Sequence, residues 1–289
     1  ECAARIDLVP MANELDKVSD LDAWHAAARG RVEGKHVRLP RRVKLFADGA
    51  YFGQNMRMNP PGYADGHLGK WITEPTDLNR QVRRYWEARF SLHIHVNGDE
   101  GLDVVLNTLE PVITGLRSAR QTVTLEHLGY STEAQNRRIS RLGLFVSGQP
   151  NYIHVLGDAY AAHGLGPDRA ATMDRFGSLE RLGVSLGLHS DFNMAPIDPF
   201  YLAWVAANRI TLDGHSLGPQ ERLSVGKALR AITIEAAQVI GRDHEIGSIA
   251  AGKRADFAVL DRDPRKMGAA ALRQTKVEAT VYDGRVFNV

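Results

Sequence analysis

Five strand-like segments separated by helix-like stretches constrain this chain more than any other feature. They cover residues 42–49, 91–99, 122–129, 144–151 and 185–191. Such an alternation is typical of a parallel sheet, because consecutive parallel strands need a long crossover connection. In a parallel α/β barrel the carboxyl ends of the strands converge on one mouth. Side chains that are far apart in sequence can therefore meet there.

Four of the five segments carry a residue that could bind a metal, namely Lys44, His95, His127 and Asp191. Imidazole and carboxylate groups bind Zn²⁺, Fe²⁺, Mn²⁺ or Co²⁺, and ligand softness alone does not choose among them. A lysine ammonium is a poor ligand. Taken alone, Lys44 also fits a solvent-facing or salt-bridged lysine, and His95 fits a hydrogen-bonded core histidine.

The residues between the strands predict the helices and loops. Pro75 near the start of residues 74–90 and an acidic first turn indicate a helix there. Ser131 as N-cap and Gly143 as stop signal bound a second helix. Further helices are expected over 101–116, 199–210 and 219–241. The long Gly- and Asn-rich stretch 50–73 is interpreted as a lid and 151–168 as a loop.

The sequence changes character near residue 246. Residues 246–289 are rich in glycine and contain short apolar strands, two of them around Asp283-Gly284, which is a typical hairpin signal. We therefore predict two domains: residues 1–245, the main α/β body, and residues 246–289, a small all-β tail.

Composition excludes several functional classes. The 36 basic and 34 acidic residues are mixed along the 289-residue chain, so no basic block favours nucleic acid. No apolar run has the length of a membrane helix, and no signal peptide opens the chain. The single Cys, Cys2, excludes an intrachain disulfide. The chain begins without Met, so we expect a longer natural protein; the compartment stays open, with the cytoplasm favoured.

Five stretches carry a family resemblance: KLFADG, HIHVNGDEG, LEHLG, LHSD and the long closing segment ALRAITIEAAQVIGRDHEIGSIAAGKRADFAVLDRDP. Each short motif alone is weak, but their order together with the closing segment is specific. The chain resembles the C-terminal half of the amidohydrolase superfamily, in particular amidohydrolase family 3, over residues 40–289.

The resemblance implies a fold. Family barrels have eight strands, and the five segments fit the fourth to eighth, with no ligand expected on the sixth family strand, here 144–151. The implied architecture is a partial TIM (β/α)8-type barrel, strands four to eight, plus the C-terminal part of a small β-sandwich. The first-strand H-x-H pair would be absent. His93 and His95 also form an H-x-H, but Lys44 precedes them, whereas the first-strand pair precedes the lysine.

The resemblance also implies a chemistry: a metal-dependent hydrolase that cleaves an amide-type C–N bond through metal-activated water. Lys44, His95, His127 and Asp191 would hold one or two divalent transition metals, with zinc favoured. Lys44 would carry a CO2-derived carboxylate, and Asp191 would be the catalytic proton shuttle. The fragment itself is expected to be inactive. The alternative is a non-catalytic regulatory or binding protein on the same fold; a phosphotriesterase-type hydrolase is a weaker one.

Further residues are candidates by position. Those expected to bind substrate are Asp48, Gly49, Tyr152, His154 and Arg175. Those expected to orient the metal ligands are His93, Asp99, Glu126 and His189. The expected partners are a small-molecule substrate and the missing N-terminal segment. Because five strands of a barrel leave two open edges, we also expect a homo-oligomer.

Overall fold

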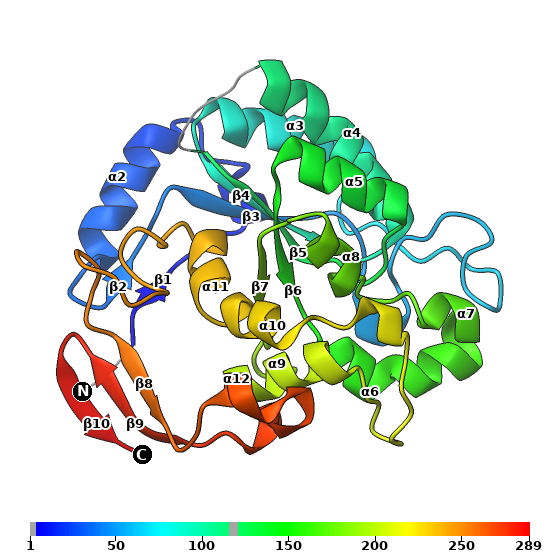
Figure 1. The fold of residues 1–289 in the computed structure, drawn as a ribbon. Helices are drawn as coiled ribbons and strands as arrows, with labels where there is room; N and C mark the ends of the chain where they lie inside the picture. The colour runs from blue at the N-terminus through cyan, green and yellow to red at the C-terminus, as the bar shows by residue number, and fades with distance from the viewer. Residues whose placement is uncertain (1–3, 116–120) are drawn as a thin grey trace.

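The central feature of the fold is a five-stranded parallel sheet in the order β3-β4-β5-β6-β7 (Figure 1). The computed structural model describes residues 4–115 and 121–289. The strands are β3 Arg42–Phe46, β4 Ser91–Val96, β5 Val123–His127, β6 Phe145–Gly148 and β7 Leu186–Leu188. All five predicted segments thus contain a strand, and the prediction of a parallel α/β arrangement is confirmed.

The pairing register sorts the side chains of this sheet onto two faces. Val43 lies beside Leu92 and Leu45 beside Ile94, and all four are fully buried in the core. Because side chains alternate along a strand, the residues between them face the other way. That second face carries Lys44, His93, His95, Thr124 and Glu126. The strand sequences therefore separate a packed apolar face from a chemically active one.

Helices wrap the outer side of the sheet (Figure 1). They are α2 Leu21–Val32, α3 Pro75–Glu87, α4 Asp99–Gly115, α5 Glu133–Leu142 and α8 Phe176–Arg181. Pro75 occupies the start of α3 as predicted. Helix α5 ends at Gly143, which is left-handed at φ 67°, but its N-cap is Thr132 rather than Ser131. Thr132 forms a capping box with Gln135, and this bonding decides the boundary.

Of two predictions beyond β6, one is wrong and the other is confirmed with breaks in the helix. Residues 151–168 are not a loop, because they contain α6 Asn151–Ala159, the π-helical turn η2 Tyr160–Gly164 and the first residues of α7 Pro167–Ala170. Residues 219–241 are largely helical as predicted, but in three pieces: η3 Pro219–Glu221, α10 Val225–Ala231 and α11 Ile234–Val239. The backbone of Thr233, at φ −131° and ψ −101°, breaks the helix between α10 and α11. Helix α9 Pro199–Asn208 agrees with the predicted one.

The segment 50–73 is packed against the body of the protein, and its interpretation as a lid stays a prediction. Its one short helix is η1 Tyr51–Gly53, and the side chains of Tyr51, Met56 and Met58 are fully buried. Backbone hydrogen bonds join Gly49 to Lys70 and Met58 to Leu68. Burial of three large side chains anchors this segment against the sheet.

The two ends of the chain lie side by side at the lower left of Figure 1. The N-terminal part contributes β1 Ile6–Asp7, α1 Ala12–Leu15 and β2 Val37–Arg38, with β1 and β2 parallel. The C-terminal part forms a separate antiparallel sheet of β8 Phe257–Leu260, β9 Val277–Tyr282 and β10 Arg285–Asn288, preceded by α12 Pro264–Met267 and η4 Ala269–Gln274. Arg5 forms ion pairs with Asp256 and Asp283 and so joins the two parts.

The C-terminal hairpin confirms its sequence signal. Asp283 and Gly284 connect β9 to β10 with φ values of 53° and 79°, the conformation that a two-residue turn requires. The predicted domain boundary between residues 245 and 246 stays a prediction. Within the described ranges no helix has the length and apolarity of a membrane span. Cys2 and the last residue of the predicted helix 101–116 lie outside the described residues.

Candidate functional site

Three imidazole rings meet at the carboxyl side of the sheet, and we call them the histidine cluster: His95, His127 and His189. His95 lies near the end of β4, His127 is the last residue of β5, and His189 follows β7. The ring centroids of His95 and His127 are 4.6 Å apart, and those of His127 and His189 are 5.0 Å apart. Nε2 of His189 lies 3.2 Å from Nδ1 of His127. Parallel pairing has thus brought together residues almost a hundred positions apart.

Burial keeps the rings of this cluster neutral. Burial, together with the positive charge of Lys44, lowers the pKa of His95 to about 4. Burial also lowers the pKa of His127 well below its usual range, with His189 and His95 adding to the effect. The pKa of His189 is lowered mainly by burial as well. A neutral imidazole has a free lone pair, which is the form that binds a metal.

Two carboxamides hold the rings of His95 and His127. Nδ1 of His127 donates to Oε1 of Gln149 at 2.9 Å, which places the lone pair of this ring on Nε2. Nδ2 of Asn97 donates to Nε2 of His95 at 3.1 Å and to the carbonyl of Gly49 at 3.2 Å. Sequence reasoning missed both residues. The available signal was an amide directly beyond the ends of β4 and β6.

Lys44 and Glu126 form the charged part of the same face. The register sets Lys44 of β3 beside His93 and Glu126 of β5 beside His95. Burial lowers the pKa of Lys44, while the carboxylates of Glu126 and Asp191 oppose that shift. Burial works to raise the pKa of Glu126, but the charge of Lys44 and a bond to His93 outweigh it and lower the pKa.

His93 and Glu126 were expected to orient ligands, and they contact each other directly. Nδ1 of His93 lies 2.6 Å from Oε1 of Glu126. The other ring nitrogen of His93, Nε2, is buried and has no hydrogen-bond partner within the described residues. His189 is held by Ser147, whose Oγ lies 2.8 Å from its Nδ1. Asp99 lies elsewhere, where its Oδ1 accepts the backbone N–H of Asn59 at 2.9 Å.

Asp191 lies at the solvent side of the histidine cluster. It follows β7 in an exposed position and has a left-handed backbone, at φ 49°. Its negative charge acts to raise the pKa of Lys44, His189 and Tyr152. The Asp191 carboxylate is therefore close enough to interact electrostatically with these groups. An exposed carboxylate beside buried nitrogen donors can exchange protons with solvent and with a bound molecule.

Of the five residues expected to bind substrate, Tyr152, Gly49 and Asp48 contact His127 or Asn97, whereas His154 and Arg175 make their bonds elsewhere. Tyr152 and Gly49 lie beside the histidine cluster: Oη of Tyr152 is 3.5 Å from Nδ1 of His127, and Gly49 bonds Asn97. Asp48 is fully buried, and its oxygens accept the backbone N–H groups of Arg57, Asn97 and Gly98.

Burial raises the pKa of Asp48 to about 7, while those three backbone bonds act in the opposite direction.

The other two candidates, His154 and Arg175, make their bonds away from the cluster. Nδ1 of His154 lies 2.7 Å from the carbonyl of Ile210, and Nε of Arg175 donates to the carbonyl of Ser131.

The residue types of the cluster fit a divalent transition metal, although the side chains do not converge on one point. Neutral imidazoles and a nearby carboxylate are the donors such a metal takes. The unpartnered buried nitrogen of His93 shows that donor capacity is left over on this face. In residues 4–115 and 121–289, however, no group of three or more His, Cys, Asp or Glu side chains is close enough to hold an ion.

Comparison with known proteins gives a consistent result. A family model described as "Amidohydrolase family" matches residues 4–287. N-substituted formamide deformylase of Arthrobacter pascens is 30% identical over 242 residues, which cover 84% of this chain and 44% of the relative. Protein LONG AFTER FAR-RED 3 of Arabidopsis thaliana is 32% identical over 223 residues, covering 75% and 38%. The chain thus spans less than half the length of these curated relatives.

A solved structure has a similar fold. The crystal structure of an uncharacterized metal-dependent hydrolase from Pyrococcus horikoshii matches with a TM-score of 0.75 at 26% sequence identity. The match covers 92% of this chain and 52% of that one. The similarity therefore extends over nearly the whole of this chain and about half of the other.

Proposed function

Because this chain belongs to the amidohydrolase family, we propose that it forms part of a metal-dependent hydrolase that cleaves an amide-type carbon–nitrogen bond. The histidine cluster with Lys44 and Asp191 beside it is the observation that carries the proposal. The substrate would be a small molecule. The relative named N-substituted formamide deformylase makes N-substituted formamides the first compounds to test.

Lys44, His95, His127 and Asp191 would hold the metal, for which zinc is our first choice. Either one or two ions would be bound, and a CO2-derived carboxylate on Lys44 would join them in the second case. The neutral state of His95 and His127 supports their part in this site. A divalent metal supplies an activated water at neutral pH.

The other steps fall to side chains of this chain. Asp191 would accept a proton from the attacking water and pass it to the leaving nitrogen. Its exposed position on the cluster's solvent side suits that exchange. Gln149 and Asn97 would keep the two imidazoles in fixed orientations, and Tyr152 would lie within reach of the bound substrate.

We further propose that the five-stranded sheet is part of a (β/α)8 barrel, strands four to eight, with residues 246–289 as a separate sandwich portion. Strands β3 and β7 are at the two edges of the sheet, and within residues 4–115 and 121–289 an isolated bridge from Met11 to Lys44 is the only pairing on the free edge of β3. Strand edges tend to pair with further strands. A preceding segment with the first-strand H-x-H pair would complete the barrel, as the longer relatives suggest.

The same edges lead us to propose that the 289-residue chain, when produced alone, is inactive and self-associates. Light scattering after size-exclusion chromatography measures the mass of the particle directly. A monodisperse monomer over a hundredfold range of concentration would contradict the proposed pairing of edges.

The catalytic proposal is tested by Asp191→Asn in the full-length protein. Loss of the carboxylate should lower kcat by about 10²–10⁴-fold, the usual contribution of a positioned acid–base group. Circular dichroism should show an unchanged fold, since Asp191 is exposed. Arg80→Gln, which changes an exposed residue of α3, is the matched control. Turnover of Asp191→Asn within a few-fold of wild type would refute the role of Asp191.

The second candidate function is a non-catalytic regulatory or binding protein on the same fold. One observation favours it: among the described side chains, no group of three or more potential ligands is close enough to hold an ion. Elemental analysis of the full-length protein separates the two hypotheses. One or two tightly held transition-metal ions per chain favour the hydrolase, whereas a metal-free protein inert towards amides favours the alternative.

A further inference from the structure

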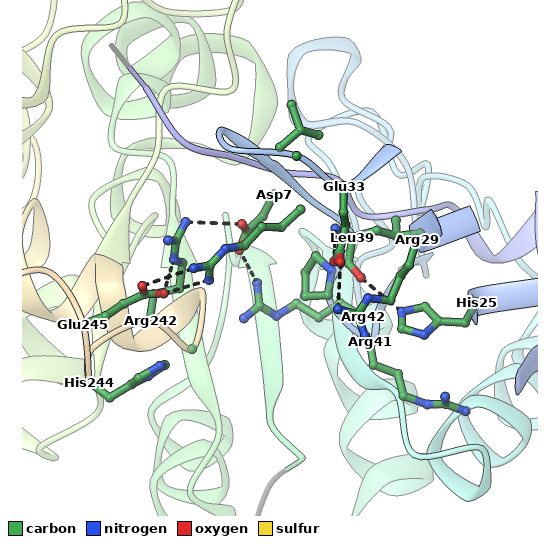
Figure 2. Close-up of a pocket in the computed structure, with 15 residues that line it drawn as sticks. Asp7, His25, Arg29, Glu33, Leu39, Arg41, Arg42, Arg242, His244 and Glu245 are labelled. Atoms are coloured by element: carbon green, nitrogen blue, oxygen red, sulfur yellow. Dashed lines mark hydrogen bonds and ion pairs between the residues drawn. The ribbon is translucent and has the colours of Figure 1, made fainter. Parts of the chain in front are cut away.

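A cavity of about 620 Å³, whose lining residues are drawn in Figure 2, lies at the amino-terminal end of the sheet. Its wall includes Arg42, the first residue of β3, whereas His95 and His127 lie near the ends of their strands. The rest of the wall comes from β1, α2, the residues leading into β3 and the turn after α11. Small ligands occupy pockets of about 300–1,000 Å³, so this volume suffices for one.

Five guanidinium groups line this space, which we call the arginine cavity: Arg29, Arg38, Arg41, Arg42 and Arg242. Three carboxylates of the described part of the chain line it with them: Asp7, Glu33 and Glu245. The lining therefore has an excess of two positive charges. The exposed Asp22 also pairs with Arg41, and counting it still leaves one positive charge in excess.

Two of the carboxylates are shared among several arginines. Asp7 accepts from Arg42 at 3.2 Å and from Arg242 at 3.3 Å. Glu245 accepts from Arg38 at 2.9 Å and from Arg242 at 2.7 Å, and it also pairs with Arg254. Each guanidinium has five N–H donors, so shared carboxylates cannot use them all.

Arg242 provides an independent sign of a missing acceptor. Its side chain is only 4% exposed, yet its Nη2 has no hydrogen-bond partner among the described residues. A buried donor without a partner is costly, and one on a cation more so. Arg242 lies in the wall of the cavity, where Figure 2 shows it between Asp7 and Glu245.

We propose that the arginine cavity binds a small dianionic oxyanion, either a phosphate group or a dicarboxylate. Guanidinium forks match the oxygens of both groups, which accept two parallel hydrogen bonds. Such a ligand balances the excess charge and gives Nη2 of Arg242 an acceptor. It also ties the N-terminal segment to the turn after α11, because residues of both line the cavity. The site is separate from the histidine cluster and does not depend on hydrolysis.

The test measures thermal unfolding and isothermal titration of the purified protein with sodium phosphate and, separately, sodium succinate. Sodium chloride keeps the ionic strength constant. We expect a saturable rise in Tm with at least one anion. The anion that binds with the higher affinity identifies the ligand as a phosphate group or as a dicarboxylate. Arg242→Gln should weaken the apparent affinity at least tenfold. Arg80→Gln, which removes an exposed arginine outside the cavity, should bind like wild type.

Arg242 also stabilises the fold through Asp7 and Glu245, so weaker binding by Arg242→Gln has two explanations: loss of a ligand contact and loss of the fold. A second variant separates them. Arg38→Gln changes a side chain that is 42% exposed, and it should weaken binding several-fold in a folded protein. No Tm shift beyond that in sodium chloride would overturn the proposal. Equal affinities in wild type, Arg38→Gln and Arg80→Gln would overturn it as well.

Discussion

The two ends of the central sheet carry nitrogen-containing side chains in different charge states. At the carboxyl side, burial lowers the pKa of the imidazoles in the histidine cluster, so they are neutral at pH 7. At the amino-terminal end, burial also lowers the pKa of Arg42, but a guanidinium has so high a pKa that it stays charged. The same desolvation thus produces lone-pair donors at one end and cations at the other.

This difference assigns different ligands to the two ends. Neutral imidazoles attract a metal cation, whereas an excess of guanidinium groups attracts an anion. The hydrogen-bond partners agree with this division. Carboxamides hold His95 and His127, whereas carboxylates hold the arginines. Separate perturbation of each end should therefore leave the other intact.

The largest expected effect comes from the histidine cluster. His127→Ala in the full-length protein should abolish tight metal binding and lower kcat/KM by more than about a hundredfold, because a direct ligand matters more than an outer partner. The anion-induced rise in Tm should be unchanged. Metal content, steady-state kinetics and thermal unfolding give the three measurements. Loss of the anion-induced rise in Tm in this variant would show that the two ends are coupled, and would contradict their independence.

A smaller effect is expected from Gln149, whose side-chain oxygen accepts from Nδ1 of His127. Gln149→Leu removes the acceptor for Nδ1 and should weaken metal affinity by about 10–100-fold. Gln149→Glu keeps an acceptor oxygen and should recover most of that loss. Competition titration with a metal chelator measures the affinity. Equal weakening in both variants would mean that Gln149 acts through packing rather than through its hydrogen bond.

The ion pairs of the arginine cavity predict that the stability of the fold depends on pH. Burial works to raise the pKa of Glu245, but hydrogen bonds from Arg242, Arg38 and Arg254 outweigh it and lower the pKa below the usual 4.5. The folded state therefore binds this proton less readily than the unfolded state. The stabilisation is present above about pH 4.5 and is lost as the pH falls below that value.

Urea unfolding at pH 7 and at pH 4 or below tests this prediction. Glu245→Gln should be less stable than wild type at pH 7, and the difference should shrink in acid. Asp261→Asn, which changes a carboxylate of the C-terminal part outside the cavity, is the control. A difference that stays constant with pH would mean that the charge of Glu245 is not what stabilises the fold.

The smallest effect is expected away from both ends. Thr132→Ala removes the N-cap of α5 and should cost about 1 kcal/mol of unfolding free energy. Metal affinity and anion affinity should both stay at their wild-type values. Chemical denaturation together with the two titrations checks this. A change in either affinity would indicate that the sites respond to global stability, and the first two predictions would then need correction for it.

Local sequence signals predicted the elements that depend on neighbouring residues. The five strands, the stop of α5 at Gly143 and the hairpin at Asp283-Gly284 all follow from periodicity or turn chemistry within a few positions. The same approach predicted that residues 219–241 are helical but did not locate the backbone break at Thr233, because the apolar pattern continues through it. It failed at 151–168, where glycines suggested a loop although most of the segment is helical.

The sequence by itself determined the five strands of the central sheet and that Lys44, His95, His127 and Asp191 stand on or just after four of them, because alternation and turn signals are local properties of the chain. The metal-site role of these four stays a prediction. Only the tertiary structure decided that Gln149 and Asn97 hold the imidazoles, and that Asp7 meets an arginine 235 positions away. Such contacts depend on the path of the whole backbone, and no spacing in the sequence encodes them.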